Sequence, residues 1–192
     1  MKNYDDILKF IILNIEGGYT NDPDDRGGET KYGITKKVFE RYKKKYKLSY
    51  EDIKDLTIED AIKIYERFYL NNYYLNLIVD KKILLLYIDM IINHGIRRAT
   101  KILQKSINTL KNKENIFNDI PNLIVDGILG KKTVSLLNKI TNYTCYNRLL
   151  YYIIVYERIQ YYKKICQRFK SQRKFLIGWI YRCYILMKQI EN

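Results

Sequence analysis

The chain has 192 residues, of which 47% are hydrophobic and 29% are charged. This balance excludes a chain that is disordered throughout, because its apolar surface can offset the entropy lost on ordering. The length predicts one domain, or one domain with a small annex. Thirty-five Lys and Arg residues against 21 Asp and Glu residues give a net charge of +14, which favours polyanionic partners such as nucleic acid, anionic lipid or cell-wall polymers.

Few residues are available for metal or disulfide chemistry. The three cysteines, Cys145, Cys166 and Cys183, cannot all pair with one another, and none lies in a CxxC motif. His94 is the only histidine. A disulfide scaffold, a zinc ribbon and most histidine metal sites are therefore disfavoured, and we expect neither a metal nor an organic cofactor.

The sequence also bears on location. No apolar run approaches the roughly 20 residues that a membrane-spanning helix needs. Asp5 and Asp6 interrupt the basic start of the chain, so no signal peptide is recognisable. We expect synthesis in a reducing cytoplasm, no membrane insertion and a monomer.

The N-terminal part begins with a helical pattern and continues into an irregular polar segment. An apolar stripe predicts a helix over 4–15, with Asn3 as its N-cap, and Gly17-Gly18 ends it. Residues 19–34 are dense in Gly, Asp, Asn and Pro. This composition predicts a loop or a small irregular hairpin.

The rest of the chain has helical patterns. Thr35 and Thr57 are placed to cap helices, and Gly95 separates a very apolar central helix from the next one. Residues 111–130 are polar and rich in turn residues. The expected helices span 35–46, 58–69, 81–93, 96–110, 131–140, 144–169 and 174–190. This pattern predicts an all-α fold, or an α fold with a minor β-hairpin.

Acidic residues gather after the first expected helix. Glu16 closes that helix, and Asp22, Asp24 and Asp25 follow in a loop bounded by glycines. Cleavage of a glycosidic bond needs one carboxylic acid to protonate the leaving oxygen and one carboxylate to orient water or stabilise the oxocarbenium-like transition state. Partial burial of Glu16 would favour its protonated form near neutral pH. The alternative is a turn whose aspartates bond their own backbone.

The segment EGGYTNDPDDRGGETKYGIT, which starts at Glu16, resembles the N-terminal signature of glycoside hydrolase family 108, a lysozyme-like family that includes phage endolysins. Further motifs follow in the family's order: TIEDAIKIYERFY, LLLYIDMIINHGIRRATKILQKSIN, VDGILGKKTVSLLN and KFLIGWIYR. The resemblance covers most of residues 4–184 and implies a lysozyme-like helical fold. Residues 1–94 would form the catalytic region. Residues 95–192 would form a second helical lobe or a peptidoglycan-binding region, continuous with the first.

The resemblance implies hydrolysis of the β-1,4 bond between N-acetylmuramic acid and N-acetylglucosamine in bacterial peptidoglycan, with Glu16 as the catalytic acid. By a weaker similarity to phage-type lysozymes, Asp25 and Thr30 take supporting catalytic roles. Either of the two preceding loop aspartates could replace Asp25. The expected substrate-binding residues are Tyr19, Asp22, Asp24, Tyr32 and Asn93.

Two other functions compete with hydrolysis. A basic helical nucleic-acid-binding protein would explain the charge but not the EGGY segment, and the sequence has no helix-turn-helix signature or RNA-binding motif. A wall-binding protein without catalysis is the other alternative. We therefore expect peptidoglycan glycan strands as the partner, with attraction to anionic wall polymers and no specific nucleic acid. The site of action would be the cell wall or periplasm after release, in phage lysis or in bacterial secretion.

Several polar residues of the later helices need a structural or functional explanation. Asp89 lies in an apolar helix, and a buried carboxylate must find a partner, so we predict that it bonds backbone N–H groups of the catalytic loop or pairs with an arginine. We predict that His94 caps or packs and that Trp179 belongs to the core. Gln104 and the Asp-Gly motif over 126–133 belong either to a saccharide-binding helix pair or to the second lobe.

Overall fold

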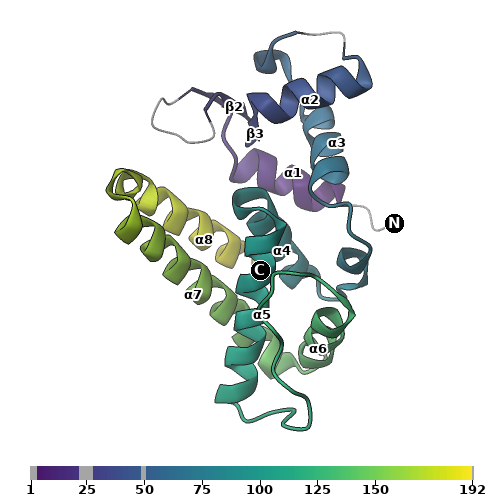
Figure 1. Cartoon of the computed structure of the whole chain (residues 1–192), viewed down its shortest axis with the longest axis vertical. Helices are drawn as coiled ribbons and strands as arrows, with labels where there is room; N and C mark the ends of the chain where they lie inside the picture. The colour runs from purple at the N-terminus through teal and green to yellow at the C-terminus, as the bar shows by residue number, and fades with distance from the viewer. Residues whose placement is uncertain (1–3, 22–27, 49–50, 192) are drawn as a thin grey trace. The chain divides into compact units, whose positions relative to one another are not determined.

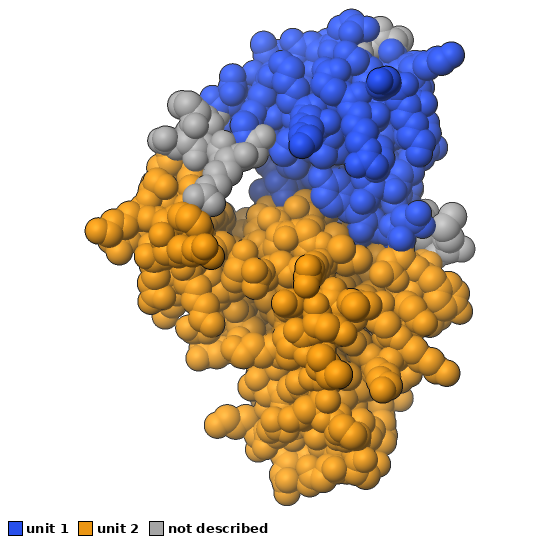
Figure 2. Space-filling view, viewed as in Figure 1, with its two compact units in different colours: residues 1–71 blue, residues 72–192 orange. Residues whose placement is uncertain are grey.

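The computed structural model describes residues 4–21, 28–48 and 51–191. The chain divides into two compact units, residues 1–71 and 72–192, which are coloured separately in Figure 2. The described residues are mostly α-helical, with one small antiparallel sheet in the first unit. This confirms the prediction of an α fold with a minor β element.

The elements are labelled in Figure 1. In chain order they are α1 (Asp5–Asn14), β1 (Tyr19–Thr20), β2 (Thr30–Lys31), β3 (Ile34–Thr35), α2 (Lys36–Tyr46), η1 (Ile53–Asp55), α3 (Ile58–Phe68), η2 (Tyr73–Leu77), α4 (Lys81–His94), α5 (Ile96–Lys113), α6 (Lys131–Thr141), α7 (Thr144–Arg168), η3 (Lys170–Phe175) and α8 (Leu176–Glu191). Each expected helix is present, which confirms the helix predictions. The short 3-10 helices η1, η2 and η3 were not expected.

The predicted capping threonines are also confirmed. The side-chain oxygens of Thr35 and Thr57 accept hydrogen bonds from backbone N–H groups in the first turns of α2 and α3, which satisfies donors that a helix start leaves without partners. Asn3, the expected cap of α1, lies outside the described residues. The structure places Tyr4 at that N-cap position, without a side-chain capping bond.

In the first unit, α1 packs against α3. Leu8 and Ile11 from α1 and Ile64 and Tyr65 from α3 are all fully buried. Leu8 and Ile11 are three residues apart, so helical spacing places them on one face of α1. The end of α1 is therefore fixed against α3, and this fixes the starting point of the segment that follows.

The sheet has the strand order β1-β2-β3, and both pairings are antiparallel. Directly opposed residues project to the same face. The paired rows are Tyr19, Lys31 and Ile34 on one face, and Thr20, Thr30 and Thr35 on the other. Ile34 is fully buried, whereas Tyr19 at the other end of the same row is 40% exposed. The first row therefore faces the core at β3, and the threonine row lies on the opposite face, away from that core.

In the second unit, α4 is the central helix. Nine consecutive residues, from Ile83 to Ile91, are buried, and α4 contacts α5, α7 and α8. A helix covered on several sides needs an apolar surface all round, which explains the composition of this segment. None of the helices in the described part of the chain combines the length and the apolarity needed to cross a membrane.

Candidate active site

Glu16 lies two residues after Asn14, the last residue of α1. Its backbone N–H donates to the Ile11 carbonyl oxygen at 2.9 Å, and its side chain is partly buried. The carboxylate lies against Gly33, because a Cβ atom at position 33 would be 2.5 Å from Glu16 Oε2. The same Cβ would be 2.6 Å from the Tyr65 hydroxyl oxygen. The candidate acid therefore lies beside a glycine turn and a tyrosine hydroxyl.

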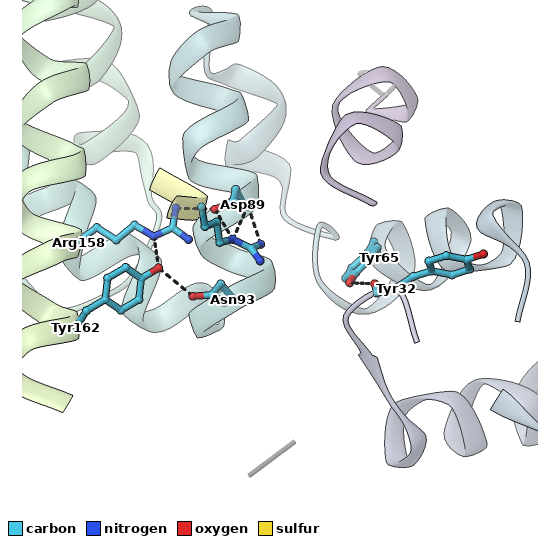
Figure 3. A network of polar contacts seen from close by, with 7 residues as sticks. Tyr32, Tyr65, Asp89, Asn93, Arg158 and Tyr162 are labelled. Atoms are coloured by element: carbon cyan, nitrogen blue, oxygen red, sulfur yellow. Dashed lines mark hydrogen bonds and ion pairs between the residues drawn. The ribbon is translucent and has the colours of Figure 1, made fainter. Parts of the chain in front are cut away.

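The turn between β2 and β3 has an unusual backbone. Tyr32 and Gly33 have φ values of +53° and +74°, so both residues of this two-residue hairpin loop lie in the left-handed region, as a type I′ turn requires. This conformation is unfavourable for a tyrosine. The Tyr65 hydroxyl donates to the Tyr32 carbonyl oxygen at 2.6 Å (Figure 3), and this bond holds the turn against α3.

Two tyrosines lie near Glu16: Tyr65 in α3, and Tyr69 at the C-cap of that helix. Tyr65 is fully buried, and its ring meets the Tyr69 ring edge-on, with centroids 5.4 Å apart. Burial raises the pKa of Tyr69, and the negative charge of Glu16 raises it further. Sequence reasoning missed both tyrosines. Their spacing of four residues in the IYERFY segment was the available signal, but it is hard to recognise among 20 tyrosines.

A second carboxylate, Glu29, is held beside the sheet. It accepts a hydrogen bond from the Tyr19 hydroxyl at 3.0 Å and forms an ion pair with Lys36 at 2.7 Å. The Lys36 bond and then the Tyr19 bond lower the pKa of Glu29, so it stays ionised. Both of its oxygens are bound by protein groups. Glu29, which the sequence analysis did not single out, therefore supports the neighbouring tyrosine.

Of the other expected site residues in the first unit, three lie within the described residues and three lie outside them. Thr30 lies in β2, in the threonine row that faces away from the core. Tyr19 is 40% exposed in β1, and Tyr32 lies in the turn beside Glu16. The loop aspartates Asp22, Asp24 and Asp25 lie outside the described residues.

Asn93 and Asp89 lie one turn apart on α4, in the second unit. Asn93 Oδ1 accepts a hydrogen bond from the Tyr162 hydroxyl at 3.2 Å. Asp89 is fully buried and forms ion pairs with Arg158 at 2.5 Å (Figure 3) and with Arg182 at 2.7 Å. Burial alone would raise the pKa of Asp89, but the two guanidinium groups outweigh it and hold the pKa below its usual value. The predicted pairing of Asp89 with arginine is confirmed.

His94 is a packed residue, as predicted. Its ring meets Tyr161 and Tyr162 edge-on, with centroids 5.1 and 5.3 Å away. Burial, reinforced by the charge of Arg158, holds the pKa of His94 well below its usual value. The histidine is therefore neutral.

The Gln104 motif holds a turn. The Gln104 amide nitrogen donates to Asp126 Oδ1 at 2.8 Å, and its oxygen accepts from the Gly127 backbone N–H at 2.9 Å. Gly127 has a φ of +83°, and a Cβ atom there would lie 2.6 Å from the Arg97 carbonyl oxygen. Gln104 itself is only 2% exposed. The motif residues thus bind one another and fasten the 126–130 turn to α5.

Two protein families match this chain, in the same order along the sequence as the motifs. Residues 10–95 match the family described as Glycosyl hydrolase 108, and residues 98–184 match the Predicted Peptidoglycan domain. The solved structure of Brucella abortus SagA resembles this chain with a TM-score of 0.70 and 23% sequence identity, covering 97% of this chain and 94% of that chain. At this identity the likeness shows a common fold. No curated protein matches the chain.

The helical fold and the matched domains define a glycoside hydrolase that acts on peptidoglycan. The hydrolase family that the motifs predicted is the one that residues 10–95 match, and the peptidoglycan domain follows this hydrolase region. The hydrolase match extends to residue 95 and therefore includes α4, which packs within the second compact unit. The expected division of function at residue 94 stays a prediction.

Proposed function

We propose that this protein hydrolyses the β-1,4 bond between N-acetylmuramic acid and N-acetylglucosamine, with Glu16 as the general acid. The observation that carries the proposal is the position of the Glu16 carboxylate against Gly33 and beside the Tyr65 hydroxyl. A general acid must be held in one place to protonate a leaving oxygen. The end of α1 and the Tyr32–Gly33 turn provide that support.

In the proposed reaction, Glu16 gives its proton to the bridging oxygen as the bond to the sugar carbon breaks. Positive charge then develops on the sugar ring, and a second carboxylate must stabilise it or activate the attacking water. We assign this role to Asp25, with Asp22 and Asp24 as the alternatives. Thr30 would orient the water through its hydroxyl, which belongs to the threonine row that faces away from the core.

The substrate in this proposal is a glycan strand of the wall. Tyr19 and Tyr32 offer rings that can pack against sugar faces, and the loop aspartates Asp22 and Asp24 can accept hydrogen bonds from sugar hydroxyls. Asn93 provides an amide from the hydrolase region. The net charge of +14 favours approach to a wall that carries carboxylate or phosphate groups.

The test is the substitution Glu16→Gln, which keeps the size of the side chain and removes its proton. We expect clearing of purified peptidoglycan to fall by a factor of about 1,000, since general acid catalysis contributes roughly 10²–10⁴-fold, while the melting temperature stays nearly unchanged. Glu59→Gln is the matched control, because Glu59 is exposed in α3. Turnover retained by Glu16→Gln would remove Glu16 from the mechanism.

The second carboxylate can be identified in the same assay. Asp22→Asn, Asp24→Asn and Asp25→Asn change the loop one residue at a time, and we expect the largest loss for Asp25→Asn. A larger loss at either of the other two positions would assign the role there instead.

A further inference from the structure

Two pairs of side chains face each other between α4 and α7. Asp89 and Asn93 are four residues apart on α4, and Arg158 and Tyr162 are four residues apart on α7, so each pair lies on one helix face. Arg158 pairs with Asp89 at 2.5 Å, and Tyr162 bonds Asn93 at 3.2 Å (Figure 3). The two helices are thus joined by an ion pair and, one turn further on, by a hydrogen bond.

The direction of these hydrogen bonds determines the orientation of the Asn93 amide. Arg158 Nε donates to the Tyr162 hydroxyl oxygen at 2.7 Å, and an arginine can only donate. Burial raises the pKa of Tyr162 far above its usual value, so the hydroxyl keeps its proton and donates it to Asn93 Oδ1. The neighbouring Cys183 thiol also has a pKa raised by burial and is a weak hydrogen-bond partner.

Because the Asn93 oxygen is bound to Tyr162, the amide nitrogen points away from that hydroxyl. Within the described ranges, the nitrogen has no protein acceptor, and it is not among the buried atoms that lack a partner. It therefore reaches solvent with its two N–H donors available. Asn93 itself is half-buried, so its position is restricted while its donors stay accessible.

The tyrosine that holds Asn93 is itself held by neighbours at both its ring and its hydroxyl. The Tyr162 ring stacks on Trp179 with centroids 5.0 Å apart and meets the His94 ring edge-on at 5.3 Å. Its hydroxyl is held by Arg158, which is 1% exposed and paired with Asp89. Losing only the hydroxyl would therefore leave the ring packing in place.

We infer that Tyr162 and Arg158 are positioning residues that hold Asn93 so that its amide nitrogen donates a hydrogen bond to a neutral oxygen of the glycan strand. This inference rests on the proposed function, because it deepens the substrate-binding role of Asn93. The positioning residues belong to the region matched by the peptidoglycan domain, whereas Asn93 belongs to the hydrolase match. Two residues of the second region thus position a residue of the first. The acceptor is an acetamido carbonyl or a sugar hydroxyl.

The experiment measures binding to purified peptidoglycan by co-sedimentation, with every variant made on the Glu16→Gln chain so that the wall is not cleaved. Asn93→Asp keeps the oxygen that accepts from Tyr162 and removes the N–H donors. Tyr162→Phe keeps the ring and removes the hydroxyl. Tyr161→Phe is the matched control, because Tyr161 also contacts His94 while no hydrogen bond of its hydroxyl is found among the described residues. Salt of about 0.5 M screens the added charge of the aspartate.

We expect Asn93→Asp and Tyr162→Phe each to weaken binding about three- to tenfold, the value of one hydrogen bond, and Tyr161→Phe to leave it unchanged. The double variant should bind no more weakly than Asn93→Asp, because the two changes remove the same contact. Equal binding by Tyr162→Phe and Tyr161→Phe, additive losses, or no binding by the parent chain would overturn the inference.

Two further measurements identify the acceptor and distinguish a failure of this inference from a failure of the proposed hydrolysis. On peptidoglycan stripped of its N-acetyl groups, the effect of Asn93→Asp disappears if the acceptor is the acetamido carbonyl and persists if it is a hydroxyl. Either result is consistent with the Asn93 amide nitrogen as the hydrogen-bond donor. A wild-type chain that binds the wall without cleaving it would refute the proposed hydrolysis, while the binding comparison would still decide the role of Asn93.

Discussion

Gly33 is the residue that leaves room for the Glu16 carboxylate. Any larger residue at this position places a Cβ within 2.6 Å of both Glu16 Oε2 and the Tyr65 hydroxyl oxygen, a separation that non-bonded atoms do not tolerate. The composition of residues 19–34 predicted a loop or a small irregular hairpin in this part of the chain. It did not indicate that the turn is the support for the acid, because this contact joins residues 17 positions apart.

Gly33→Ala should therefore reduce activity by more than the backbone strain of the substitution alone would. Gly28 supplies the control, since its φ of +66° is similar but no atom of the described residues lies within 4 Å of a Cβ there. We expect Gly28→Ala to cost about 1 kcal/mol of unfolding free energy with activity retained. Gly33→Ala should cost at least that and also reduce wall clearing at least tenfold. Equal activity in the two variants would show that Glu16 tolerates displacement.

His94 predicts a specific pH dependence of stability. Its folded pKa is held well below its usual value by burial, whereas the unfolded chain takes up this proton below about pH 6.5. Stability should therefore fall as the pH drops below about 6.5, by up to about 1.4 kcal/mol per pH unit. Because the chain has one histidine, His94→Phe should flatten denaturant-unfolding free energies between pH 6.5 and 5. If the unfolding free energy of His94→Phe depended on pH as steeply as that of the wild type, this role of His94 would be contradicted.

At the scale of helices, Asp89 joins α4 to α7 and α8 through Arg158 and Arg182. Removing the carboxylate leaves two buried guanidinium groups without their counterion, which costs about 3–5 kcal/mol. We expect Asp89→Asn to lower the free energy of unfolding by this amount in denaturant titrations. Because the folded pKa of Asp89 is lowered, its contribution is fully present above about pH 4 and is lost as the pH falls through the folded pKa.

A wild-type chain that kept its stability through that acid range would contradict this assignment. Asp60→Asn provides the comparison, since Asp60 makes a partly exposed ion pair with Lys63 at 3.1 Å. Such pairs contribute at most about 1 kcal/mol, so we expect only a small change. The contrast separates the loss of a buried pair from the general effect of removing an acid.

The helices were predictable because their signals are local. Apolar spacing, the capping Thr35 and Thr57, and the glycines at helix ends lie within a few residues of the structures that they determine. The position of Glu16 beside Gly33 and the hydrogen bond between Asn93 and Tyr162 depend on tertiary packing and could not be read from spacing. Asp89 shows the intermediate case, in which the need for a partner was predictable but the identity of the two arginines was not.

At the scale of the whole molecule, the hydrolase match and the compact units have different boundaries. The match runs through α4 to residue 95, whereas the first compact unit ends at residue 71. The central helix of the hydrolase region is therefore packed by helices from the peptidoglycan domain. We expect a chain truncated after residue 95 to expose the apolar faces of α4 and to lose folding, rather than to yield an independent hydrolase.

The net charge of +14 predicts that wall binding depends on salt. Exposed charges interact over about 10 Å at 0.1 M ionic strength and over about 3 Å at 1 M. Co-sedimentation of the Glu16→Gln chain with walls should therefore weaken several-fold as salt rises over this range. The effect should be larger for walls that retain anionic phosphate polymers than for walls stripped of them. Salt-independent binding would show that the charge does not contribute.

The most direct test of the central claim is mass spectrometry of peptidoglycan fragments after digestion and chemical reduction of their new ends. We predict that the wild-type protein gives fragments that have gained one water and carry reduced N-acetylmuramic acid, and that Glu16→Gln gives none. Reduced N-acetylglucosamine, products lighter by one water, or fragments released equally by Glu16→Gln would contradict the proposed reaction.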